Sequence, residues 1–266
     1  MNDFEKYLHN YVKLGVRVGV NIQPGQPLVI QAPTEAAEVV RLAAKEAYAA
    51  GARHVHVEWN DDELTRIRHE MAPEESFADG PKLRMNYYER LIEQNAAFLS
   101  LVSANPDLLS GIDPDRIAKF QKATREAMAK YSEGARKEKF SWSILAVASE
   151  VWAKKVFPDA PEDQRVRKLW DAIFQATRAD LPDPVAAWKE HIKKLQSRSL
   201  YLNAKRYHAI HYQAPGTDLM LELADDHLWV AADSLNEKGT MFVANMPTEE
   251  VFTAPKRNGV NGTVRS

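Results

Sequence analysis

The pattern of hydrophobic and polar positions divides the first 204 residues into alternating helices and strands. Apolar side chains recur at helical spacing over residues 4–20, 34–51, 61–70, 82–95, 113–134, 161–176 and 184–204. Apolar or alternating runs typical of strands lie at 28–30, 54–59, 98–102 and 142–147. This order predicts a parallel sheet with right-handed crossovers. We therefore expect residues 1–204 to form an α/β domain with a Rossmann-like parallel sheet and flanking helices, in which Thr34 caps the second helix and Gly51 ends it.

The character of the chain changes after residue 204. Short alternating runs at 207–212, 218–223 and 227–231 follow one another without a connecting helix, which is typical of an antiparallel meander. We place a domain boundary near Ala204, with residues 205–266 as the start of a β-rich α+β domain. A β-rich unit of only about sixty residues has little core of its own. Because the last residues look like an unfinished strand, we expect this domain to be truncated.

Composition and charge exclude several classes of function. The chain has 35 Lys and Arg against 37 Asp and Glu, a net charge of -2, so it has no basic field for a nucleic-acid backbone. It contains no cysteine, which excludes disulfides, thiolate zinc sites and a cysteine nucleophile and is compatible with a reducing cytosol. The start is polar and acidic rather than signal-like, and no run approaches the ~18 apolar residues of a membrane span. We expect a cytoplasmic protein without membrane contacts.

Motifs for common catalytic sites are missing from the predicted α/β domain. The sequence has no glycine-rich phosphate loop, no Gly-x-Ser-x-Gly elbow and no His-Glu-x-x-His helix. His54, His56 and Glu58 share one face of a predicted strand and could together hold a divalent metal. The more ordinary interpretation, which we prefer, is that they form the polar face of an amphipathic strand.

Two adjacent carboxylates, Glu249 and Glu250, lie between Pro247 and Pro255, just after a predicted strand at 240–243. Loops at strand ends often carry functional sites, and prolines would hold a carboxylate with little conformational freedom to lose. A carboxylate is a good ligand for zinc, manganese or cobalt, and one that bridges two cations relieves their repulsion. The alternative is one helical turn with Thr248 as its N-cap and acidic residues at the positive helix end. The residues alone leave both interpretations open.

The string from Asn245 to Pro255, together with Asn258-Gly259-Val260-Asn261-Gly262, resembles the hallmark of the aminopeptidase T/aminopeptidase S family, peptidase family M29. Further similar segments lie at 17–21, 169–180, 202–206 and 215–219, so the resemblance covers essentially all 266 residues. It implies a cytoplasmic metalloaminopeptidase that uses two divalent ions (zinc, cobalt or manganese) to remove N-terminal residues from short peptides. It also implies a homodimer whose active sites open onto a shared cavity.

The resemblance also assigns roles within the chain. It places the first metal ligand of the family on Glu250, with Glu249 as its neighbour. We expect the Glu249 side chain either to point outward or to support the ligands without binding the metal itself. The family's other ligands and its proposed base come later in longer chains, so the resemblance assigns no catalytic residue here. Residues 1–204 would help to dimerise the protein and to wall off the cavity. We expect the 266-residue chain alone to be inactive and to bind no metal stably; the alternative is a non-catalytic α/β binding or assembly module.

Overall fold

The computed structural model describes residues 2–265, which form two compact units. The first unit comprises the described residues through Ala187 together with Ser234–Pro247. The second unit comprises Trp188–Asp233 and the described residues from Thr248 onwards. The chain therefore leaves the first unit, returns to it for a short segment and leaves it again. Whether residues 1–204 and 205–266 divide the functions of the protein stays a prediction.

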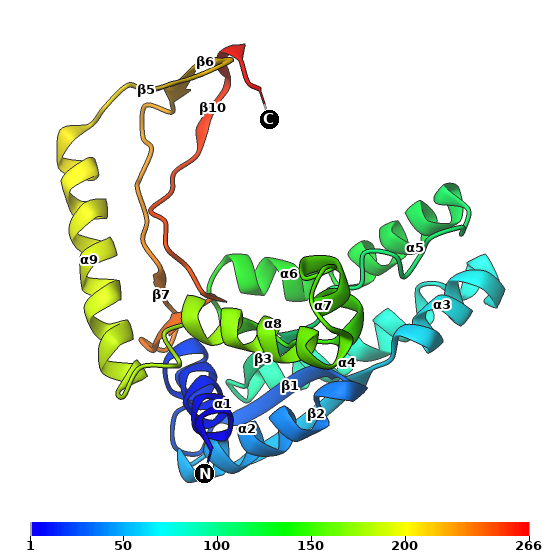
Figure 1. Ribbon diagram of the computed structural model, residues 1–266. Helices are drawn as coiled ribbons and strands as arrows, with labels where there is room; N and C mark the ends of the chain where they lie inside the picture. Colours follow the sequence, from blue (N-terminus) through cyan, green and yellow to red (C-terminus); the bar gives the residue numbers. More distant parts are fainter. Residues whose placement is uncertain (1, 266) are drawn as a thin grey trace. The chain divides into compact units, whose positions relative to one another are not determined.

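A five-stranded parallel sheet flanked by helices forms the centre of the first unit (Figure 1). Its strands are β1 (Pro27–Pro33), β2 (His54–Asn60), β3 (Ala97–Val102), β4 (Trp142–Ala146) and β9 (Asn245–Met246), in the order β2-β1-β3-β4-β9. Every neighbouring pair is parallel. The predicted α/β class and the four predicted strands are confirmed. β9 was not predicted, because it is only two residues long and comes from the distant C-terminal part of the chain.

The helices follow the predicted periods, with three differences. They are α1 (Asp3–Leu14) with a π-helical continuation (Gly15–Gly19), α2 (Ala37–Ala49), α3 (Asp62–Met71), α4 (Asp79–Glu93), α5 (Pro114–Ala127), α6 (Ala129–Arg136), α7 (Glu150–Val156) and α8 (Glu162–Ala176). Thr34 does not cap α2: it begins a 3-10 turn, Thr34–Ala36, that precedes the helix. The predicted 113–134 helix is interrupted at Met128. The short helix α7 was not predicted.

Aromatic side chains build much of the core around this sheet. Phe98 on β3 is 1% exposed and packs on Tyr88, Tyr131 and Phe140, with ring centroids 4.9–5.1 Å from its own. Such tilted and edge-to-face arrangements are favourable beyond the area that they bury. A 3-10 turn (Glu74–Ser76) lies between α3 and α4 in the chain. The core thus fixes α4 and α6 against one side of the strands.

The second unit holds α9 (Pro184–Lys205) from Trp188 onwards and a three-stranded antiparallel sheet. The sheet strands are β5 (Ala209–Ala214), β6 (Thr217–Leu223) and β10 (Pro255–Thr263), in the order β10-β6-β5. Gly262 has a φ of 128°, and a Cβ there would lie 2.0 Å from the carbonyl oxygen of Asp218, so only glycine fits.

The prediction of a strand over 227–231 is wrong. In the structure, Val230 makes only an isolated bridge to Phe252. The remaining strands, β7 (Asp233–Leu235) and β8 (Met241–Val243), pair with each other. None of the described helices is both long and apolar enough to cross a membrane.

Candidate functional site

The predicted metal-ligand segment is an extended connection between two strands. It starts at Met246 on β9, which is buried, and continues through a cis peptide bond to Pro247. Phe252 is held to Val230 by two backbone hydrogen bonds of 2.9 and 3.1 Å. No helix occurs over residues 248–254. The interpretation of Thr248 as the N-cap of a helical turn is therefore wrong, and the two carboxylates lie on a segment without regular secondary structure.

Within the second unit, the two carboxylates differ in their contacts. A carboxylate oxygen of Glu250 accepts a 2.9 Å hydrogen bond from the backbone N–H of Glu249, and the Glu250 side chain is exposed. Glu249 lies beside His191 of α9, with 3.5 Å between its carboxylate oxygen and the ring Nε2. The same ring nitrogen donates a 2.7 Å hydrogen bond to the carbonyl of Thr248. His191 thereby positions the start of the segment directly before Glu249.

His191 was missed from the sequence. Its ring contacts Trp188 edge-on, with centroids 5.4 Å apart, and its side chain is only 10% exposed. A histidine three residues after a buried tryptophan lies on the inner face of a helix. This spacing indicates that His191 is buried, but it does not identify its hydrogen-bond partner Thr248, which is 57 residues away in the sequence.

The donor set around Glu250 does not make a complete metal site. Among residues 2–265, no group of three or more histidine and acidic side chains lies close enough to hold a metal ion. A protein zinc site uses three or four protein ligands, and a single carboxylate must compete with water for the cation. The described residues therefore do not by themselves supply such a ligand set. The assignment of Glu250 as ligand and Glu249 as its neighbour stays a prediction.

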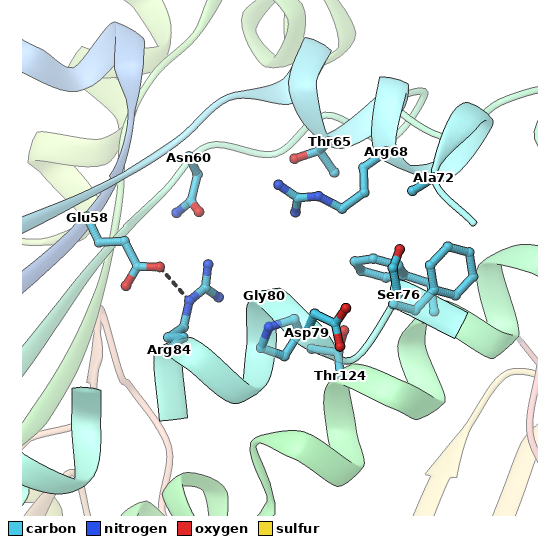
Figure 2. Close-up of a pocket in the computed structure, with 13 residues that line it drawn as sticks. Glu58, Asn60, Thr65, Arg68, Ala72, Ser76, Asp79, Gly80, Arg84 and Thr124 are labelled. Atoms are coloured by element: carbon cyan, nitrogen blue, oxygen red, sulfur yellow. Dashed lines mark ion pairs between the residues drawn. The ribbon is translucent and has the colours of Figure 1, made fainter. Parts of the chain in front are cut away.

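His54, His56 and Glu58 lie on β2, at the edge of the parallel sheet, and their partners are not each other. The ring of His56 lies 4.7 Å from that of Tyr87, and Glu58 accepts a 2.5 Å hydrogen bond from the hydroxyl of Tyr88. Glu58 also forms an ion pair with Arg84, drawn dashed in Figure 2. Burial, and then the hydrogen bond to Glu58, raise the pKa of Tyr88 far above its ordinary value. The interpretation as the polar face of a strand fits these contacts better than a metal site.

Glu58 also belongs to a chain of hydrogen bonds at the carboxyl end of the sheet. Ser100 on β3 donates to the side-chain oxygen of Gln31 at 2.7 Å, and the amide of Gln31 donates to Tyr88. Tyr88 donates to Glu58, which pairs with Arg84. This network connects three neighbouring strands to α4. It orients Arg84, which lines a pocket beside β2 (Figure 2).

We expect protonation of His56 to weaken the fold in acid. Partial burial lowers the pKa of His56 below 6.5, although the charge of Glu58 opposes the shift. A lowered folded-state pKa means that neutral His56 contributes stability above the unfolded-state pKa, and that this contribution is lost as the pH falls through the folded-state pKa. Between about pH 7.5 and about pH 5, His56→Asn should lose less stability than the unchanged chain. Urea denaturation at both pH values measures this, and equal losses would contradict it.

Comparisons with known proteins cover the whole chain. The model of the thermophilic metalloprotease (M29) family matches residues 4–266. Aminopeptidase 2 of Geobacillus stearothermophilus is 48% identical over 266 residues, which are 100% of this chain and 64% of that protein. Aminopeptidase T of Thermus thermophilus is 41% identical over 100% of this chain and 65% of its own length. The solved structure of wild-type AmpT from Thermus thermophilus matches with a TM-score of 0.90 at 40% identity, over 97% of this chain and 64% of that one. The chain thus spans less than two thirds of the length of these relatives.

Proposed function

The chain belongs to the thermophilic metalloprotease (M29) family. We propose that it is part of a metal-dependent aminopeptidase that hydrolyses the N-terminal residue from short peptides. The observation that carries the proposal is the family match over residues 4–266. Relatives with 40–48% identity over nearly the whole chain are named aminopeptidases. At this identity the chain has the same fold as the AmpT structure, with a TM-score of 0.90.

We propose Glu250 as one ligand of the catalytic cations and Glu249 as the neighbour that supports it. The exposed Glu250 carboxylate uses one oxygen to accept the N–H of Glu249, which leaves lone pairs for a cation. His191 orders the preceding backbone through Thr248. Oxygen ligands of this kind suit zinc, cobalt and manganese alike, so the donor chemistry supports a divalent cation without selecting among the three.

The other parts of the chain would shape access rather than react with the peptide. We propose that residues 1–204 help to form a homodimer and to wall off the space that peptides enter. The proposed location is the cytoplasm. The sequence contains no cysteine, which is compatible with a reducing compartment. Hydrolysis of a peptide bond by divalent cations requires a complete ligand set. The described residues supply one proposed ligand, so no reaction step is assigned to them.

The test uses the 266-residue polypeptide and a longer relative side by side. We expect the 266-residue polypeptide to bind no stoichiometric divalent metal and to release no chromogenic amine from aminoacyl substrates, because one carboxylate cannot hold a cation against water. Aminopeptidase T of Thermus thermophilus serves as the positive control in the same assays. Metal content is measured by mass spectrometry and turnover by absorbance. Hydrolysis by the 266-residue polypeptide that a chelator abolishes would contradict the incomplete ligand set.

A non-catalytic α/β binding or assembly module remains the competing function. It would be favoured if a longer relative with an intact Glu250 equivalent also bound no metal and released no amine. Metal-dependent release by that relative, together with inactivity of the 266-residue polypeptide, is the result that the peptidase proposal expects.

A further inference from the structure

A pocket of about 560 Å³ lies beside the end of β2, entirely within the first unit. Glu58 and Asn60 line it from β2, Thr65 and Arg68 from α3, and Asp79 and Arg84 from α4 (Figure 2). The pocket lies at the carboxyl end of β2, the edge strand of the parallel sheet. We propose that it binds a small molecule with an apolar body and one carboxylate group, held by Arg68 and Arg84. The proposal does not depend on the proposed peptidase function.

Two guanidinium groups enter the pocket from opposite walls. Figure 2 shows Arg68 reaching in from α3 and Arg84 from α4, with the amide of Asn60 near both. Arg68 has no ion pair with any described residue, and the Asn60 side chain has no hydrogen-bond partner among residues 2–265. Arg84 pairs with Glu58 through its Nε, and a guanidinium has five N–H donors, so other donors remain. Planar, forked donors of this kind match a carboxylate.

The walls that carry these arginines are fixed in place. Arg84 is oriented by Glu58, which itself accepts from Tyr88 at 2.5 Å. On the opposite wall, Arg116 of α5 donates to the carbonyl oxygens of His69 and Ala72 at the end of α3. These bonds hold the last turn of α3, which carries Arg68, against α5. A ligand would therefore meet one donor group, that of Arg84, that is already oriented, which reduces the entropy lost on binding, whereas the exposed Arg68 side chain would be ordered by the ligand on a fixed turn of helix.

The rest of the pocket determines what kind of anion fits. Phe77 and Phe120 form an apolar wall, with ring centroids 5.2 Å apart. Thr124 lines the pocket with a buried hydroxyl oxygen that has no hydrogen-bond partner among the described residues. Glu58 offsets the charge of Arg84, and Asp79 adds another negative charge to the lining. Asp79 likewise offsets Arg68, so the four charged side chains of the lining sum to about zero, and a ligand with one negative charge is accommodated more readily than a phosphate dianion.

The probe is N-acetylphenylalanine, which combines an aromatic body with one carboxylate, and its matched control is the uncharged N-acetylphenylalanine amide. Isothermal titration calorimetry on the 266-residue chain should show saturable binding of the acid. The amide should bind at least ~10-fold more weakly, because it lacks the charge-assisted hydrogen bonds to the guanidinium groups. Inorganic phosphate should compete poorly.

Variants connect the binding to the named residue. Arg68→Gln should weaken binding of the acid by about tenfold or more, and Arg68→Lys should weaken it less, because lysine keeps the charge but loses the fork. Arg41→Gln, an exposed arginine on α2 outside this pocket, is the matched control and should bind as the unchanged chain does. Circular dichroism checks that each variant is folded.

The outcomes separate the alternatives. Binding of the acid that is lost in Arg68→Gln and kept in Arg41→Gln supports the proposal. Equal binding of acid and amide, or equal binding by Arg68→Gln and the unchanged chain, would overturn it. Competition by phosphate at concentrations similar to those of the acid would show a general anion site and overturn the carboxylate assignment. No binding of the acid to the folded chain would also overturn it.

Discussion

Glu250→Gln is expected to abolish metal-dependent release of N-terminal residues when the change is made at the equivalent position of an active family member. The amide has nearly the same size and shape as the carboxylate but no negative charge, so the cation loses a charged ligand while the fold is kept. Loss of a residue that only supports a ligand costs 10–100-fold in metal affinity or activity, so loss of the ligand itself should cost at least about 100-fold in turnover. Turnover and metal content are measured on the same preparation.

Glu249→Gln is the matched control for that change. Glu249 lies beside His191 and is proposed to support its neighbour rather than to bind the cation, so its replacement should reduce turnover much less than that of Glu250. A Glu250→Gln protein with full metal content and unchanged turnover would remove Glu250 from the site. Equal losses in both variants would show that the two carboxylates share the role.

Phe98→Ala is expected to cause a large loss of stability in the first unit. Phe98 is 1% exposed on β3 and contacts three aromatic rings from other elements. Removing a buried phenylalanine costs about 3–5 kcal/mol, because the transfer free energy is lost and a cavity remains. Urea denaturation followed by far-ultraviolet circular dichroism reports on the first unit, which holds α1 to α8.

Leu83→Ala on α4 provides the control, because its side chain is 71% exposed. We expect it to change the free energy of unfolding by less than about 0.5 kcal/mol, as is usual for surface substitutions. Since the chain has two units, each transition is fitted separately rather than as one two-state process. A Phe98→Ala protein as stable as Leu83→Ala would show that the aromatic cluster does not support the sheet.

The strands and helices that the sequence predicted correctly are those that carry their own period over several residues. β1 to β4 each contain an apolar or alternating run, and burial of residues 28–30 on β1 follows directly from that run. β9 could not be predicted in this way, because a strand of two residues is too short to show a hydrophobic periodicity. It exists because Leu145 on β4 pairs with Met246. Conversely, the run at 227–231 has a strand pattern, but only Val230 finds a partner.

The candidate site shows the same division between local and distant information. Local sequence identified Glu249 and Glu250, because two carboxylates between prolines and a family-like string are features of neighbouring residues. It could not supply His191, whose partner Thr248 lies 57 residues further along. It also could not bring Arg68 and Arg84 to one pocket, since they come from different helices on either side of it.

The amino-acid pattern was therefore sufficient for the α/β class, most of the elements, the family resemblance and the acidic pair at 249–250. Periodicity and short motifs are properties of adjacent residues, so they can be read without a structure. Tertiary packing alone decided that 245–246 extends the parallel sheet, that Glu58 pairs with Arg84, and that His191 meets the segment before Glu249. Those contacts join residues far apart in the chain, and their free energy depends on burial and geometry that exist only after folding.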